Sequence, residues 1–154
     1  MTEPTKKKKP WLKRILITLL GLVVIFACIY WIVATEKFAD TKDREAVFTV
    51  NAIDFIREFE KDDKAANKKY AEKIITVNGM VSEIEAADTT MNIKFIDTVS
   101  GSYAIFAFQE QYIAEAKTLK VGDTASIKGS CSGGVLSEIL GSEFITFKRC
   151  TLNK

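Results

Sequence analysis

The feature that most constrains this chain is an uncharged apolar run that extends from Ile15 to Ala34. Its 20 residues are enough for a helix to cross a hydrocarbon core about 30 Å thick. Six basic residues stand just before it: Lys6, Lys7, Lys8, Lys9, Lys13 and Arg14. Basic segments stay on the cytoplasmic side of a membrane. We therefore expect a cytoplasmic tail over residues 1–14, a transmembrane helix over 15–34 and export of the remainder.

Two other interpretations of the run stay open. A cleaved signal peptide has an apolar core of about 7–15 residues followed by small residues, whereas here Ile32 lies just before a possible cut after Ala34. Cys28 suggests a lipoprotein, but Phe26 fits that signal poorly and apolar residues follow the cysteine. We favour an uncleaved anchor in a bacterial inner (cytoplasmic) membrane, with a periplasmic or other extracytoplasmic domain.

The net charge of +2 hides two segments of opposite sign. Residues 1–34 hold six Lys or Arg and one Glu, whereas residues 35–154 hold 16 basic and 19 acidic residues. The exported part therefore carries a charge of −3. A domain that grips phosphates needs an excess of Lys and Arg, so this balance argues against nucleic acid as the main ligand.

Beyond a predicted linker over 35–47, one domain is expected over 48–154. Asn51 to Glu60 has the period of a helix, with Ala52, Ile56 and Phe59 on one face and Asn51 as a plausible N-cap. Five strands follow, near residues 74–82, 92–96, 103–108, 124–131 and 144–152, with a helical segment over 109–119 between the third and the fourth. This order predicts a mainly β fold, a five-stranded OB-fold Greek-key barrel with a leading helix.

The same stretch resembles the tRNA_anti-like OB-fold family. The resemblance rests on Phe55, on the Asn67-Lys68-Lys69-Tyr70 element with Lys73, and on Val77-Asn78-Gly79-Met80-Val81. It continues through Val121-Gly122-Asp123, Ile127 to Gly133 and Phe147-Lys148-Arg149-Cys150. The family often has a glycine before the lysine, where this chain has Ala71-Glu72. The resemblance implies the fold and little about activity, because most of the family is uncharacterised.

The chain carries no motif of a known catalytic or cofactor site. It has no histidine, which excludes Ser-His-Asp and Cys-His catalysis and histidine metal sites. The glycine-rich stretch from Gly129 to Gly134 lacks the Lys-Ser/Thr of a phosphate-binding loop. We therefore expect no enzyme, no cofactor and no metal.

Cys131 and Cys150 are the two cysteines outside the apolar run. Folded symmetrically about Leu140 and Gly141, the last two strands would place these cysteines opposite each other. An oxidising compartment then predicts a disulfide, which would stabilise the domain by about 3 kcal/mol. The alternative is a pair of buried free thiols.

An OB barrel binds ligands on its second and third strands and in the loops at one end. The candidate ligand-binding residues are Asn92, Lys94, Tyr103, Phe106 and Phe108, with the loops 86–90 and 134–142. Phe106 and Phe108 share one face of their strand and can equally belong to the core. Leu136, Ile139 and Leu140 either pack across the barrel end or form a partner-binding patch.

These features predict a non-catalytic binding module that is anchored by residues 15–34 and engages a partner protein or a small sugar or peptide ligand. The alternative is a nucleic-acid-binding OB-fold protein. Its support is a local group of basic residues: Lys64, Lys68, Lys69 and Lys73.

Overall fold

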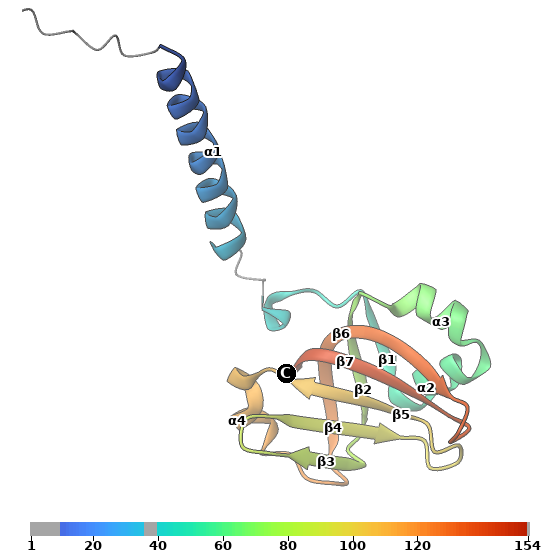
Figure 1. Ribbon diagram of the computed structural model, residues 1–154. Coiled ribbons are helices and arrows are strands. Elements are labelled where there is room, and N and C mark those ends of the chain that lie inside the picture. The colour runs from blue at the N-terminus through green and yellow to red at the C-terminus, as the bar shows by residue number, and fades with distance from the viewer. Residues whose placement is uncertain (1–9, 36–39, 154) are drawn as a thin grey trace, which may run out of the picture. The chain divides into compact units, whose positions relative to one another are not determined.

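The computed structural model describes residues 10–35 and 40–153 (Figure 1). The chain divides into two compact units, Met1–Phe38 and Ala39–Lys154. In the first unit, helix α1 spans Pro10–Thr35. Its segment Arg14–Ile32 is long and apolar enough to cross a membrane, judged by length and composition. Thr18 carries the one hydroxyl of that segment outside its aromatic residues. This hydroxyl donates to the Ile15 carbonyl at 2.9 Å, as hydrocarbon surroundings would require.

The second unit contains short helices and a mixed sheet of seven strands. Its helical segments are η1 (Thr41–Asp43), α2 (Ala52–Lys61), α3 (Asp63–Tyr70), η2 (Glu110–Tyr112) and α4 (Ile113–Ala116). Its strands are β1 (Phe48–Asn51), β2 (Ile74–Met80), β3 (Glu83–Ala86), β4 (Met91–Ile96), β5 (Tyr103–Phe108), β6 (Thr124–Ser137) and β7 (Ser142–Leu152).

The strands form one sheet in the order β1-β2-β6-β7-β5-β4-β3 (Figure 1). Strand β3 forms one edge of the sheet, and β2 lies next to the other edge. Only Val81 and Ser82 separate β2 from β3, so the sheet closes on itself and the fold is OB-like. Strands β5 and β7 run parallel, and β6 pairs antiparallel with both β2 and β7. The predicted number of five strands is wrong for two reasons. β1 adds a short parallel strand beside β2, and the expected first strand is divided at Val81–Ser82.

Helix α2 lies over the core because its apolar residues recur at helical spacing. The Asn51 side chain caps the helix by accepting the backbone N–H of Ile53 at 3.0 Å, which confirms the predicted cap. Phe55 and Phe59 are fully buried, and the ring of Phe55 packs on Phe147 of β7. Burial of these large side chains is the main favourable contribution to the docking of α2 on the sheet.

The β6–β7 hairpin is longer than predicted. The segment from Gly134 to Ser142 was expected to be a loop, but β6 extends to Ser137 and the turn closes with the N–H of Gly141 donating to the Ser137 carbonyl. The pairing shifts between Cys131 and Gly133, and Gly133 has a φ of 103°. The glycines of β6 therefore accommodate a bulge within a continuous strand. Composition alone does not distinguish such a bulge from a loop.

Cys131 and Cys150 are free thiols in this structure, and the predicted disulfide between them is absent. The hairpin turns between Ser137 and Ser142, and the bulge between Cys131 and Gly133 changes the register further, so Cys131 lies opposite Phe147. Both thiols are buried, which is the alternative arrangement considered above. Burial raises the pKa of Cys131 to about 11 and raises the pKa of Cys150 well above its usual value.

Candidate functional site

Strands β4 and β5 divide the predicted ligand-binding residues between two faces. Asn92, Lys94 and Tyr103 lie on the face turned away from the core and are each half-buried. Phe106 is fully buried and Phe108 is 8% exposed, so both belong to the core. A ligand on the other face would not touch these two phenylalanines, because the sheet itself lies between them and the ligand.

We call the side turned away from the core the outer face. It consists of Glu83, Glu85, Asn92, Lys94, Ile96, Tyr103, Ile105, Phe144, Thr146 and Val135, from five neighbouring strands.

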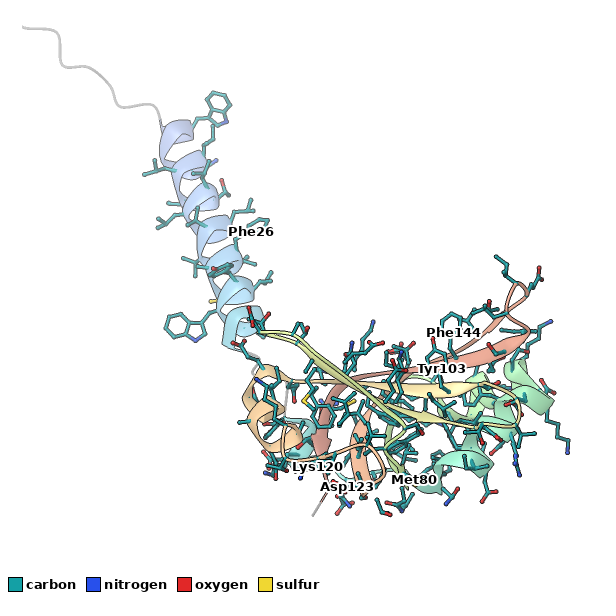
Figure 2. All side chains as sticks on the ribbon, turned by 90° about the horizontal axis from the view of Figure 1, so that it is seen from below. Phe26, Met80, Tyr103, Lys120, Asp123 and Phe144 are labelled. Carbon is teal, nitrogen blue, oxygen red and sulfur yellow. The ribbon has the colours of Figure 1, made fainter. Side chains whose placement is uncertain are left out.

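Strand register places four apolar residues of the outer face in one line. Ile96 lies opposite Tyr103, Tyr103 opposite Phe144, and Phe144 opposite Val135. We call these four residues the aromatic row. It crosses β4, β5, β7 and β6, and Figure 2 shows Tyr103 and Phe144 next to each other on the sheet. Val135 is 57% exposed, so the row presents apolar surface to solvent.

The next cross-strand positions carry charge instead. The Lys94 ammonium contacts the carboxylates of Glu83, at 3.3 Å, and Glu85. The hydrogen bond from Lys94 lowers the pKa of Glu85, and the bond to Glu85 raises the pKa of Lys94. The Lys94 side chain is only 15% exposed. Its charge is therefore matched within the protein, and these three groups together carry a net negative charge.

Tyr103 is held from both sides. The Phe144 ring stacks on it with centroids 6.3 Å apart and planes inclined by 22°. The Lys94 ammonium lies 5.3 Å from the centroid of the same ring. These two neighbours come from β7 and β4, which flank β5 on opposite sides, so the Tyr103 ring has a neighbour on each side. Its edge and hydroxyl remain for a ligand, whereas a nucleobase would need a free ring face on which to stack.

The aromatic row has distinct surroundings at its two ends. At the β4 end, Ile96 also lines a pocket of about 250 Å³ together with Met80, Ser82 and Asn51. At the β6 end, the row continues into the hairpin turn. Ile139 is 96% exposed and Leu140 is 73% exposed, so neither packs across the barrel end.

The sequence interpretation missed two members of the aromatic row, Ile96 and Phe144, and placed Val135 in the candidate binding loop 134–142. Phe144 had a detectable signal, because Ile145 and Phe147 are core residues and strand alternation turns Phe144 to the other face. Val135 was expected in a binding loop, because it follows two glycines, whereas the structure places it on β6.

The basic residues proposed for nucleic acid do not form one group of free cations. Lys69 contacts Glu58 at 2.7 Å and lies 4.6 Å from the centroid of Tyr70. Lys73 donates to the Lys69 carbonyl. Lys64 and Lys68 are the two exposed basic residues of α3 that remain. Within residues 10–35 and 40–153, no group of three His, Cys, Asp or Glu side chains is placed to hold a metal ion.

A solved structure that is similar to this chain shares its fold. A "putative nucleic acid-binding lipoprotein" from Klebsiella pneumoniae is 18% identical, with a TM-score of 0.54 over 68% of this chain and 91% of that one. An OBody bound to hen egg-white lysozyme is 13% identical, with a TM-score of 0.42 over 55% of this chain and 84% of that one. At this identity the first comparison shows the fold alone. No curated protein sequence matches this chain.

A family model gives the remaining comparison. It matches residues 1–140, which include α1 and every strand of the sheet except β7. The chain therefore belongs to the tRNA_anti-like family.

Proposed function

We propose that this protein is a non-catalytic binding module anchored in a bacterial inner membrane. In this proposal α1 crosses the membrane once, the basic residues before it stay in the cytoplasm, and the OB-like domain lies outside the cytoplasm. The domain engages a partner protein, or a small sugar or peptide ligand, through the outer face. The observation that carries the proposal is the aromatic row, a partly exposed apolar line built by register across four strands.

The chemistry of the outer face favours an uncharged or partly apolar ligand. Tyr103 and Phe144 supply large apolar area with few rotatable bonds, as binding surfaces commonly do. Glu83 and Glu85 add carboxylate oxygens that accept hydrogen bonds from ligand hydroxyl or amide groups. Lys94 is already paired with both carboxylates, so the face offers little to a phosphate backbone.

Nucleic-acid binding is the second candidate function. The Klebsiella protein with the same fold carries that description, and Lys64 and Lys68 are exposed on α3. Against it stand the covered ring of Tyr103 and the −3 charge of residues 35–154. Electrostatic binding to a phosphate backbone would weaken steeply with added salt.

Membrane placement is tested by labelling a cysteine at the hairpin turn. A Glu138→Cys variant in intact spheroplasts should react with a membrane-impermeant maleimide, because residue 138 is exposed. The unsubstituted protein is the control, since Cys131 and Cys150 are buried. Labelling only after lysis would contradict the proposed orientation.

Use of the outer face is tested by photo-cross-linking in living cells. A photoreactive phenylalanine at position 103 or 144 should give a discrete adduct that the same group at Thr124 does not give. Thr124 is an exposed position at the far end of β6. In parallel, the full chain in detergent is titrated with single-stranded DNA and RNA. Salt-sensitive binding that disappears in Lys64→Glu/Lys68→Glu, without adducts at 103 or 144, would favour the second candidate function.

A further inference from the structure

Glu143 is a buried carboxylic acid that lacks a partner for one oxygen. The residue is 1% exposed, and its Oε1 has no hydrogen-bond partner among the described residues. Buried polar groups in native proteins are nearly always hydrogen-bonded, and an unpaired one costs about 1–3 kcal/mol. A carboxylate in this position would cost more, since burial penalises the charged form. Stability therefore does not explain why a carboxyl group is buried at position 143.

The surroundings of this carboxyl are tight and uncharged on the sheet side. A Cβ added to Gly134 would lie 2.9 Å from Glu143 Oε1 and 2.5 Å from Phe59, so these groups are packed against one another. The backbone N–H of Glu143 donates to Ser102 Oγ at 2.9 Å, which fixes the start of β7 beside β5. Neither Gly134 on β6 nor Ser102, just before β5, offers a countercharge.

The helices bring further negative charge to the same carboxyl. Glu60 of α2 and Asp63 of α3 both oppose its ionisation. Burial first, and then these two carboxylates, raise the pKa of Glu143 above its usual range. The neighbouring amide of Asn67 is neutral, and both of its polar atoms are bonded to Gly134. The two charges of α2 and α3 that shift the pKa of Glu143, those of Glu60 and Asp63, thus both disfavour the carboxylate form.

We propose that the Glu143 carboxyl is a proton-operated latch between the β6–β7 hairpin and the α2–α3 pair. In its neutral form the hairpin closes on the helices. When the proton leaves to solvent, the carboxylate is repelled by Glu60 and Asp63 and must regain water, so the hairpin loosens. Val135 and Phe144 belong to that hairpin, so the latch also controls half of the aromatic row. This last consequence rests on the proposed function, whereas the latch itself does not.

The test is hydrogen–deuterium exchange of the full chain in detergent micelles at about pH 5 and about pH 8, corrected for intrinsic exchange rates. Peptides from residues 134–147 should lose protection by about tenfold or more at the higher pH. Peptides from β4 should not. Glu143→Gln should keep its protection at both values. Glu138→Gln, on the same hairpin but exposed, should behave as the unsubstituted protein does.

Two outcomes would overturn the latch: no pH-dependent loss in the unsubstituted protein, or the same loss in Glu143→Gln. If Glu143→Gln does not fold, a Glu60→Gln/Asp63→Asn variant serves instead. Removing these charges should move the midpoint of protection loss to lower pH, and an unchanged midpoint would refute the proposal. Hydrogen–deuterium exchange needs no ligand. A failure of the latch proposal is therefore distinguishable from a failure of the proposed function, which the cross-linking experiment tests.

Discussion

The side-chain amide of Asn67 holds the peptide backbone of Gly134 with two hydrogen bonds, each 2.9 Å long. Its Nδ2 donates to the Gly134 carbonyl, and its Oδ1 accepts the Gly134 N–H. The pair ties α3 to β6 just after the bulge at Gly133, where the regular strand pairing shifts. One amide side chain thereby satisfies both backbone groups of a residue beside an irregular part of the sheet.

Replacing Asn67 with alanine should therefore destabilise the domain. Both backbone groups of Gly134 would lose their partners in a half-buried position, which costs about 1–3 kcal/mol in the free energy of unfolding. Urea denaturation followed by circular dichroism measures the change. Lys68→Ala, at the next and exposed position of the same helix, is the matched control and should change the midpoint little. Equal effects of the two substitutions would contradict the role assigned to Asn67.

A methyl group at Gly134 should also be costly. In Gly134→Ala the new Cβ would stand 2.5 Å from Phe59 Cδ1 and 2.9 Å from Glu143 Oε1, so the α2–β6 contact would have to shift. Overpacking of this kind typically costs about 1–3 kcal/mol. Thermal unfolding is the measurement, with Ser132→Ala at a nearby exposed position as the control. An unchanged melting temperature in Gly134→Ala would show that the hairpin does not pack tightly on Phe59.

Cys131 and Cys150 should react as slow, buried thiols. Little thiolate is present at neutral pH, because burial raises the pKa of Cys131 to about 11 and that of Cys150 well above its usual value. In the folded protein, alkylation followed by mass spectrometry should leave both cysteines unmodified. After unfolding without reductant, both should be modified in full. A requirement for reductant would instead show that the two residues are disulfide-bonded in the cell.

Acid should weaken the domain through Asp97. Its Oδ1 accepts the Val99 N–H at 3.0 Å and its Oδ2 accepts Arg57 Nε at 2.9 Å. The Val99 bond first, and then Arg57, hold the pKa of Asp97 below its usual value of 3.8. The folded state thus binds this proton less readily than the unfolded state does. The contribution of Asp97 is present above about pH 4 and is lost as the pH falls through the lowered pKa.

Melting temperatures between about pH 7 and about pH 3 test this relationship. Asp97→Asn should melt lower than the unsubstituted protein near neutrality, and the difference should shrink in acid. Asp88→Asn, on the exposed β3–β4 turn, should show no such convergence. Parallel curves for Asp97→Asn and the unsubstituted protein would argue against the link from α2 to the β4–β5 turn. The pH range over which Asp97 loses its contribution lies below the range expected for the ionisation of Glu143. The effects of these two residues can therefore be measured separately.

Local patterns in the sequence predicted the elements whose stability depends on nearby residues. The Asn51 cap and the stripe containing Phe59 depend on contacts within a few residues, and both are present in α2. Strand alternation likewise placed Phe106 and Phe108 on one face. Which face points inward depends on packing against other strands, so it could not be decided from alternation alone.

The features that were missed depend on partners far away in the chain. β1 has only four residues and forms a strand because it pairs with β2, more than twenty positions later. The division at Val81–Ser82 accompanies a bond from the Val81 N–H to the Asp123 carbonyl. The pairing of Cys131 with Phe147 follows from the position of the hairpin turn and from the bulge between Cys131 and Gly133, neither of which a local pattern reveals. The aromatic row has the same origin, since its four members come from four separate strands.

The enclosed position of Tyr103 has a consequence for the energetics of binding. A side chain that must be immobilised when a ligand arrives costs about 0.5–1.5 kcal/mol of conformational entropy. The Tyr103 ring is already restrained by Lys94 on one side and by Phe144 on the other. Most of that entropy is therefore lost during folding, before any ligand is present. The outer face thus presents a preorganised anchor, and a modest contact area there can yield more affinity than the same area on a mobile loop.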